Sequence, residues 1–508
     1  FKQKTAYEIR LSLVGSEMCI RDRSMDNPSP AVRLSFKEKL SYGIGDVGNA
    51  LAVSSVSFWL LIYLTDMVGL GASLAGVAMM IGRAWDALSD PVVGWASDNT
   101  QTRWGKRRPF LLFAALPYTF FYCLLWTIPE LNSELATFIY VTVVLVFFST
   151  CFALIIVPYA SLTAAMTNDY NERLSLTGFR MVCAQSAFLI GAVFPSFLVL
   201  WITDPEGGRV VLTNLGLSAI NEQLFGSWAY TARQGYAVMA LLFTIIMLAG
   251  YWTCFAGIKE RGTTARKSSS HSANPFSYIG QILKQLKSNP PFRMAISILC
   301  LSECAAALVA INLPYFVRYV LDLEQYRTWI LFSLFAGAIC AIPLWTHLGR
   351  RFGKAETYKI VVRCYAVILC FLPLLPQGAL VGTILVALAG GICHSAALMI
   401  PWSMIPDVVE YDQLKSGERR EGLFYGGALF SYKLATALGV LLSGLALDLI
   451  QYVPNQDQTP STVLGMKILI CVGPGIFLLS AAWLAGRYPL NSAKHGEILA
   501  ALREKGRT

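Results

Sequence analysis

The stretch Arg83-Ala-Trp-Asp86-Ala-Leu-Ser-Asp90-Pro91 follows directly on a long apolar run that begins at Gly71. Asp86 and Asp90 are four residues apart, so on a helix they lie on one face, one turn apart, and Arg83 can lean toward them. A charge at the centre of a bilayer costs about 2.5–3.5 kcal/mol even on the most lenient scale, so such residues face cavities and have partners. The alternative is a structural ion pair that locks two helices together. We favour a carboxylate pair that binds a cation.

The composition is typical of a helical membrane protein with many spans. Of the 508 residues, 55% are hydrophobic and 14% are charged, whereas about a quarter of a soluble domain is charged. The mean hydropathy is +0.53. Twelve segments are long and apolar enough to cross the roughly 30 Å hydrocarbon layer, so we predict an all-α membrane protein. These predicted helices are 40–67, 72–97, 109–128, 135–166, 177–203, 230–257, 294–320, 328–347, 358–375, 381–411, 420–447 and 463–487.

The twelve predicted helices form two sets of six around a polar connection, which is the plan of a two-bundle transporter. Residues 1–24 lack a start Met and any periodic pattern, so we expect them to be a non-native leader. The remaining expected segments are a cytoplasmic N-terminus at 25–39, a six-helix bundle at 40–258, a cytoplasmic linker at 259–292, a second six-helix bundle at 293–487 and a cytoplasmic tail at 488–508.

The charged residues predict the orientation of the chain in the membrane. Lys and Arg gather in one set of connections, including the linker, while Asp and Glu dominate the other set. By the positive-inside rule the Lys- and Arg-rich connections are cytoplasmic, so both termini are expected in the cytoplasm. The same distribution accounts for the formal net charge of +10 without a nucleic-acid partner.

Four motifs, taken in chain order, resemble those of one transporter family. They are Tyr42-Gly-Ile-Gly-Asp46-Val-Gly, the Arg83 to Pro91 stretch, Arg103-Trp-Gly-Lys-Arg-Arg-Pro109 and Asp407-Val-Val-Glu410-Tyr411. Together they are similar to the glycoside–pentoside–hexuronide:cation symporter family of the major facilitator superfamily, whose best-known member is the melibiose permease. The similarity covers most of the chain. It implies the major facilitator fold, with 12 transmembrane helices in two six-helix bundles, placed in the bacterial cytoplasmic (inner) membrane.

The resemblance also implies a secondary active transporter rather than an enzyme. Sodium or a proton would move down its gradient in symport with a sugar or glycoside, such as a pentoside or hexuronide. The partners would be the small-molecule substrate, the coupling cation and membrane lipid, with no cofactor and no metal beyond that cation. The sequence contains no nucleophile elbow, no His/Cys group with metal-ligand spacing and no P-loop, which fits this expectation.

The family's cation site lies on helix II, which implies that role for Asp86 and Asp90. Ser89 occupies a neighbouring position and can add an oxygen ligand of the kind that hard cations such as sodium favour. Lys433 matches a lysine of helix XI close to that site. Its ammonium group would neutralise Asp86 or Asp90 when no cation is bound. We count Lys433 with the substrate-binding candidates.

The other substrate-binding candidates are Asp46, Asn49 and Arg180. Arg180 matches a family arginine that contacts sugar, and its fork of donors suits hydroxyl or carboxylate groups; a contact with lipid headgroups or a gate is the alternative. The melibiose permease also uses an aspartate on helix I and another on helix IV, and those positions here hold Ala50 and Ile156. Asp46 is four residues before Ala50, on the same face, and can serve instead. The loss of both aspartates argues against a galactoside substrate.

The resemblance implies an inner gate built from charged residues at the cytoplasmic ends of the helices. Its candidates are Arg173 in the first half and Asp407, Glu410 and Arg419 in the second. The alternative is a set of ordinary solvated helix ends.

Two other functions stay open from the sequence. Relatives of this fold carry lysolipids or other amphiphiles, and the apolar residues Ala50 and Ile156 lend that reading some support. A lipid substrate predicts a hydrophobic side opening between the bundles. A membrane sensor that does not transport is the other alternative.

Overall fold

The computed structural model describes residues 34–167, 170–203, 232–260, 275–418, 420–490 and 492–504. All regular secondary structure in these ranges is helical. The first half contains α2 (Phe36–Ile44), α3 (Val47–Ile62), η1 (Tyr63–Met67), α4 (Ala72–Asn99), α5 (Arg108–Phe113), α6 (Ala115–Trp126), α7 (Glu134–Met166), α8 (Tyr170–Thr203) and α11 (Ala232–Gly257). The second half contains α13 (Pro290–Tyr315), η2 (Phe316–Val320), η3 (Glu324–Tyr326), α14 (Arg327–Phe352), α15 (Lys354–Leu369), η4 (Leu372–Leu374), α16 (Leu380–Ser416), α17 (Glu421–Leu449) and α18 (Pro460–Ala485).

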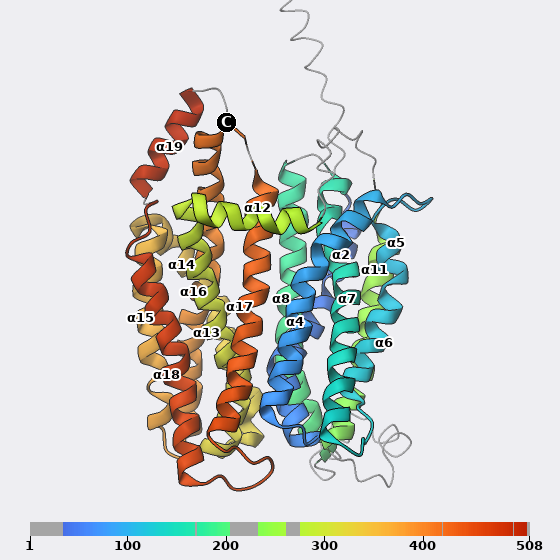
Figure 1. Cartoon of the computed structure of the whole chain (residues 1–508), viewed down its shortest axis with the longest axis vertical. Coiled ribbons are helices and arrows are strands. Elements are labelled where there is room, and N and C mark those ends of the chain that lie inside the picture. The colour runs from blue at the N-terminus through green and yellow to red at the C-terminus, as the bar shows by residue number, and fades with distance from the viewer. Residues whose placement is uncertain are drawn as a thin grey trace, which may run out of the picture.

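These helices form two bundles that stand side by side (Figure 1). The N-terminal bundle runs from α2 to α11 and the C-terminal bundle from α13 to α18. Helix α4 of the first packs against α17 of the second, and the pairs α3–α13 and α8–α14 complete the interface. Two further helices lie at one end of the molecule: α12 (Pro275–Ser288), which runs across it, and α19 (Ser492–Glu504), which packs against α16.

Eleven helical spans in the described part of the chain are long and apolar enough to cross a membrane. Helix α4 has the length of a span but is not one of these, because the charges of Arg83, Asp86 and Asp90 lower its hydropathy. It stands inside the assembly, between α7 of its own bundle and α17 of the other. With α4 as the twelfth span, the predicted fold of two six-helix bundles is confirmed. The helix that hydropathy alone would omit is the one that carries the predicted cation site.

Some helix ends differ from the predicted bounds because caps, rather than hydropathy, set them. Ser35 and Glu38 form a capping box that starts the first span at Phe36, four residues before the predicted start. This span is interrupted at Gly45 and Asp46, between α2 and α3, and it ends in the π-helical segment η1.

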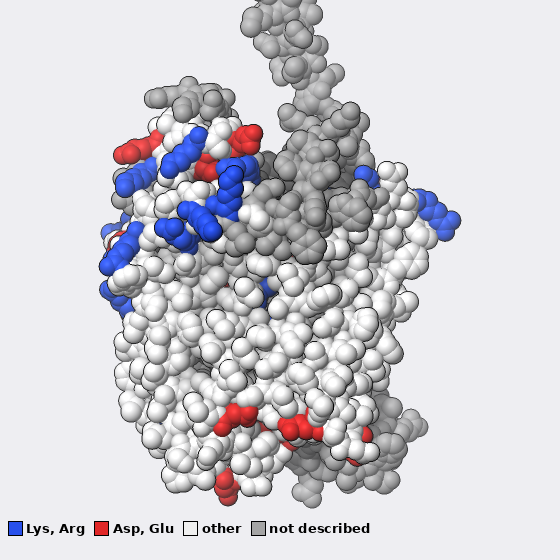
Figure 2. Space-filling view, in the orientation of Figure 1, with Lys and Arg blue, Asp and Glu red and all other residues white. Residues whose placement is uncertain are grey.

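Charged side chains mark the two ends of the molecule (Figure 2). On the face shown, Lys and Arg dominate the end that carries α12 and α19, which we call the basic end. Asp and Glu dominate the opposite end, formed by the connections 127–133, 321–326 and 450–459, which we call the acidic end. The surface between them is almost free of charge, as a hydrocarbon layer requires.

The two bundles are tied together at the acidic end. Asp66, at the end of the first span, is buried and accepts hydrogen bonds from Arg318 Nη1 at 3.0 Å and from the Tyr319 and Tyr452 hydroxyl groups, each at 2.5 Å. Ser73 adds a second link through its backbone N–H, which donates to Asp448 at 3.0 Å. The acidic end is therefore closed in this conformation.

Candidate functional site

The two aspartates of α4 face α17 at the interface between the bundles. Lys433 Nζ lies 2.9 Å from Asp86 Oδ2 and 2.6 Å from Asp90 Oδ2. The four-residue spacing puts both carboxylates within reach of one ammonium group, as expected for one face of a helix. Asp86 is only 8% exposed. The structure thus brings together three of the predicted site residues, from both halves of the chain.

Each of these carboxylates keeps one oxygen without a hydrogen-bond partner. Asp86 Oδ1 and Asp90 Oδ1 are buried, and no described residue donates a hydrogen bond to either. An unsatisfied buried acceptor costs about 1–3 kcal/mol, and more when it is charged. Since one ammonium group serves two carboxylates, the cluster retains two oxygen atoms that a cation can bind.

Arg83 is a second basic residue near the pair. Its Nη2 donates to Ser57 Oγ on α3 at 2.9 Å, so the guanidinium is directed toward α3, while its charge still acts on Asp86. Two acids and two bases therefore balance the local charge. Ser89, the third predicted cation ligand, is buried beside the pair, and its hydroxyl donates to the Asp86 carbonyl oxygen at 3.0 Å.

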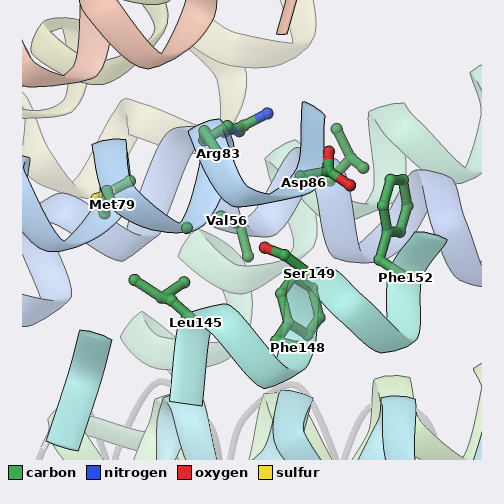
Figure 3. A pocket seen from close by; sticks show the side chains of 10 residues that line it. Val56, Met79, Arg83, Asp86, Leu145, Phe148, Ser149 and Phe152 are labelled. Atoms are coloured by element: carbon green, nitrogen blue, oxygen red, sulfur yellow. The ribbon is translucent and has the colours of Figure 1, made fainter. Parts of the chain in front are cut away.

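A small cavity lies next to Asp86, between α3, α4 and α7 of the N-terminal bundle (Figure 3). Its volume is about 50 Å³, which is room for a few water molecules. The lining is apolar except for Arg83, Asp86 and Ser149. Phe152 also lines it, and the Lys433 ammonium lies 5.7 Å from the centre of that ring. Asp86 thus belongs both to the ion-pair cluster and to the cavity.

The remaining predicted substrate residues form a separate cluster within the N-terminal bundle. Arg180 Nε pairs with Asp46 Oδ2 at 2.9 Å, and Asn49 Nδ2 donates to Asp46 Oδ1 at 3.1 Å. The Tyr251 hydroxyl donates to Asn49 Oδ1 at 2.8 Å. Arg180 also stands over the Tyr159 ring, 5.8 Å from its centre. Both oxygens of Asp46 are therefore engaged, one by Arg180 on α8 and the other by Asn49 on α3.

The predicted gate residues are only partly described. Arg419 and the side chain of Arg173 lie outside the described part of the structure. Asp407 and Glu410 lie at the basic end of α16, where Lys354 Nζ contacts both Asp407 oxygens at 2.7 and 2.8 Å. His495 of α19 lies 2.5 Å from Glu410 Oε2.

Asp407, Glu410 and His495 also offer ligand atoms within 4.8 Å of one another, a spacing that a metal ion could use. The Lys354 ammonium already neutralises Asp407, however, so we interpret the group as a charge network that joins α15, α16 and α19.

Sequence reasoning missed several of these partners. Lys354 is one of several basic residues near the connections and belongs to no motif, and His495 lies in a tail that carries no motif. Tyr251 lies in an apolar helix whose few polar residues give no periodic signal. The hydroxyl of Tyr251 and the charge of Lys354 find their partners only through packing between helices far apart in the sequence.

Comparisons with known proteins identify the family. Over residues 41–492 the chain matches the family described as MFS/sugar transport protein, where MFS denotes the major facilitator superfamily. It is 31% identical to a symporter of Synechocystis sp., over 95% of this chain and 99% of that protein. It is 29% identical to the glucuronide carrier protein homolog of Escherichia coli, over 92% and 95% of the two chains. It is 27% identical to the sodium-dependent lysophosphatidylcholine symporter 1 of Mus musculus, over 94% and 90%.

A solved structure supports the fold. The bacterial homolog of the human lysosomal transporter Spinster, in its inward-facing and unoccupied conformation, aligns with a TM-score of 0.62 at 12% identity, over 92% of this chain and 97% of that one. The chain therefore belongs to the MFS/sugar transport protein family, and it has the major facilitator fold of the glycoside–cation symporters that its motifs resemble.

Proposed function

We propose that this protein is a secondary active transporter that couples the entry of a cation to the uptake of a sugar or glycoside. The observation that carries the proposal is the pair Asp86 and Asp90, which share the single ammonium of Lys433 at the bundle interface and each keep one unpartnered oxygen. A fixed ion pair would use its acceptors fully. A site that exchanges its cation needs acceptors that are free when the cation is absent.

The coupling follows from where the charges are attached. Lys433 belongs to the C-terminal bundle and the two aspartates to the N-terminal bundle, so these ion pairs link the halves. A cation bound to the carboxylates replaces the ammonium as their counter-charge and loosens that link. The bound cation and a bound substrate then favour closure together, and the bundles rock about a site at mid-membrane.

The side to which this conformation opens is inferred from the two ends. The acidic end is closed by Asp66 and its donors, so we propose that the substrate site opens toward the basic end. By the positive-inside rule we assign the basic end to the cytoplasm, with both termini inside. This conformation is then the one that releases substrate into the cell.

The substrate class rests on the second cluster and on the relatives. Arg180, held in place by Asp46, carries hydrogen-bond donors that suit hydroxyl groups and the carboxylate of a hexuronide. A relative named as a glucuronide carrier homolog points the same way. We therefore propose a glycoside, pentoside or hexuronide as cargo.

Transport by the purified protein in proteoliposomes tests the proposal. Labelled sugars would be offered under a sodium gradient and under a pH gradient imposed separately. We expect Asp86→Asn to abolish cation-driven uptake, because the amide keeps the shape of the side chain and removes its charge. Glu130→Gln is the matched control, since it removes an acid that is 91% exposed at the acidic end. Undiminished uptake by Asp86→Asn would refute the role of the pair.

A lysolipid is the second candidate cargo. Ala50 and Ile156 replace two sugar-binding aspartates of the melibiose permease and pack, partly buried, against the hydrophobic core. A relative is named as a lysophosphatidylcholine symporter. Adding a labelled lysolipid to the same panel decides between the two cargoes, because a sugar carrier moves the sugar and leaves the lysolipid outside.

A further inference from the structure

Tyr251 of α11 lies at the buried end of the cluster that contains Arg180. Hydrogen bonds run from the Tyr251 hydroxyl to Asn49, from Asn49 to Asp46 and from Asp46 to Arg180. Tyr251 and Asn49 are buried, at 0% and 4% exposed, whereas the Arg180 side chain is 25% exposed. The chain of hydrogen bonds therefore begins in the core and ends at the member that a substrate can reach.

The Asn49 amide is held in one orientation. A carboxylate only accepts hydrogen bonds, so the amide must turn its NH2 group toward Asp46 Oδ1, which lies 3.1 Å away. The amide oxygen then faces the Tyr251 hydroxyl at 2.8 Å, and this hydroxyl must donate. Because Asn49 occupies Oδ1, Asp46 holds Arg180 through Oδ2, at 2.9 Å from Nε. The hydroxyl of Tyr251 thus determines how Asp46 holds the guanidinium.

The motif residue Gly48 makes room for this arrangement. A Cβ atom at position 48 would lie 2.7 Å from both Cζ and the hydroxyl oxygen of Tyr251, closer than side-chain carbons approach one another. Glycine is a poor helix former, yet α3 carries one where Tyr251 reaches the helix. Any other residue at position 48 would push the hydroxyl away from Asn49.

We propose that Tyr251 is a positioning residue, which acts through this chain of hydrogen bonds to orient Arg180 toward the carboxylate of an acidic sugar. The inference rests on the proposed function and narrows its cargo to hexuronides. Without the hydroxyl, the Asn49 amide loses its fixed orientation and Asp46 Oδ1 loses its donor. Asp46 then draws the guanidinium into a two-point pair, the usual arrangement of arginine with a carboxylate, and fewer donors remain for the substrate.

The charge of the cargo separates this role from simple packing. A guanidinium binds a carboxylate through two parallel hydrogen bonds, so its orientation is critical for an acidic sugar. A single hydrogen bond to the hydroxyl of a neutral sugar makes a weaker demand on orientation. Loss of the Tyr251 hydroxyl should therefore affect a hexuronide more than the matching neutral sugar.

Uptake of a labelled alkyl glucuronide by the full chain in proteoliposomes tests the inference, with the matching alkyl glucoside for comparison. We expect Tyr251→Phe to raise the KM for the glucuronide by roughly tenfold, the effect of one lost hydrogen bond to a charged group, and that for the glucoside by less. Gly48→Ala should act in the same way. Tyr122→Phe is the matched control, because it removes a buried hydroxyl that meets α3 elsewhere, at Ser55 Oγ, 2.8 Å away.

Asn49→Ala shows whether Tyr251 acts through the amide. In that background Tyr251→Phe should have no further effect on KM, because the link is already broken. An equal effect of Tyr251→Phe with and without the amide would overturn the inference, as would equal rises in KM for the two sugars.

The inference and the proposed function can fail separately. A wild-type KM in Tyr251→Phe, with cation-driven uptake intact, would overturn the inference alone. A wild-type protein that takes up no glucuronide would also overturn it, and cation-driven uptake of another sugar, abolished by Asp86→Asn, would leave the proposed function standing. Undiminished uptake by Asp86→Asn would refute the proposed function itself.

Discussion

Two buried acidic sites join the same pair of bundles, and they are built in opposite ways. At the acidic end, the carboxylate of Asp66 accepts from Arg318 at 3.0 Å, from Tyr319 and Tyr452 at 2.5 Å each, and from Thr65 Oγ1 at 2.8 Å. Between the two ends of the interface, Asp86 and Asp90 share one ammonium group, and one oxygen of each has no partner among the described residues.

The difference shows how one interface holds a closed end and an exchangeable site at the same time. A carboxylate whose acceptors are all used is stable in one arrangement and resists change. A pair whose acceptors are half used has a second stable arrangement available, with a cation in place of the ammonium. The satisfied site favours closure of the acidic end, and the unsatisfied site gives the interface its dependence on the cation.

The largest effect should come from removing the shared ammonium. Lys433→Met leaves two buried carboxylates facing each other without a counter-charge, and breaking a buried ion pair in this way costs about 3–5 kcal/mol. We expect transport to be lost and the unfolding temperature to fall in the absence of sodium. Added sodium should raise the unfolding temperature more than in the wild type, because no ammonium competes with it.

Lys433→Arg provides the control for that experiment. Arginine keeps the positive charge, so we expect stability near that of the wild type. The wider guanidinium is a poorer match for two carboxylates one helical turn apart, so transport should be slowed. Equal sodium protection in Lys433→Met and the wild type would show that the ammonium and the cation do not compete.

A smaller effect is expected at the satisfied site. Asp66→Asn keeps the shape but removes the charge, and hydrogen bonds to a charged group are worth about 1.5–3 kcal/mol each. The acidic end should open more often, so the backbone of the 450–459 connection should exchange its hydrogens faster. Glu130→Gln at the same end is the control. The Glu130 side chain is 91% exposed, so its ion pair with Arg233 should contribute little to stability.

Unchanged hydrogen exchange in Asp66→Asn would mean that the apolar contacts around the cluster, and not its hydrogen bonds, keep the acidic end closed. The two sites would then differ less than their geometry indicates.

The same contrast explains what could be predicted from the sequence. The two bundles follow from hydropathy. The face that Asp86 and Asp90 share on α4, a span that hydropathy alone would omit, follows from their helical spacing. The meeting of Lys433 with this pair needed the family resemblance, because 343 residues separate it from Asp90. The Asp66 cluster was not predicted at all. Its donors from the C-terminal bundle lie in η2 and in the 450–459 connection, both far from Asp66 in the sequence. Tyrosine and arginine side chains are common near the ends of membrane-spanning helices, so they gave no signal.

The smallest effect concerns one donor to Asp66 and depends on pH. Tyr452 lies in the connection between α17 and α18, where burial and the neighbouring Asp66 carboxylate raise the pKa of its phenol above the ordinary value near 10. Below a pH of about 10 the Tyr452 phenol is protonated in both the folded and the unfolded chain, and its hydrogen bond to Asp66 contributes fully to stability. Above it the unfolded chain loses the phenol proton while the folded protein keeps it, so this share falls as the pH rises toward the folded pKa.

Tyr452→Phe should therefore lower the free energy of unfolding by about 1–2 kcal/mol near neutral pH. The difference between variant and wild type should shrink above about pH 10, because only the wild type has this proton to lose. Thermal unfolding in detergent, at about pH 8 and again at about pH 10.5, measures both parts. A difference that stays constant across that range would mean that Asp66 does not hold the Tyr452 proton. The closed end would then depend on Arg318 and Tyr319, the other donors that cross from the C-terminal bundle.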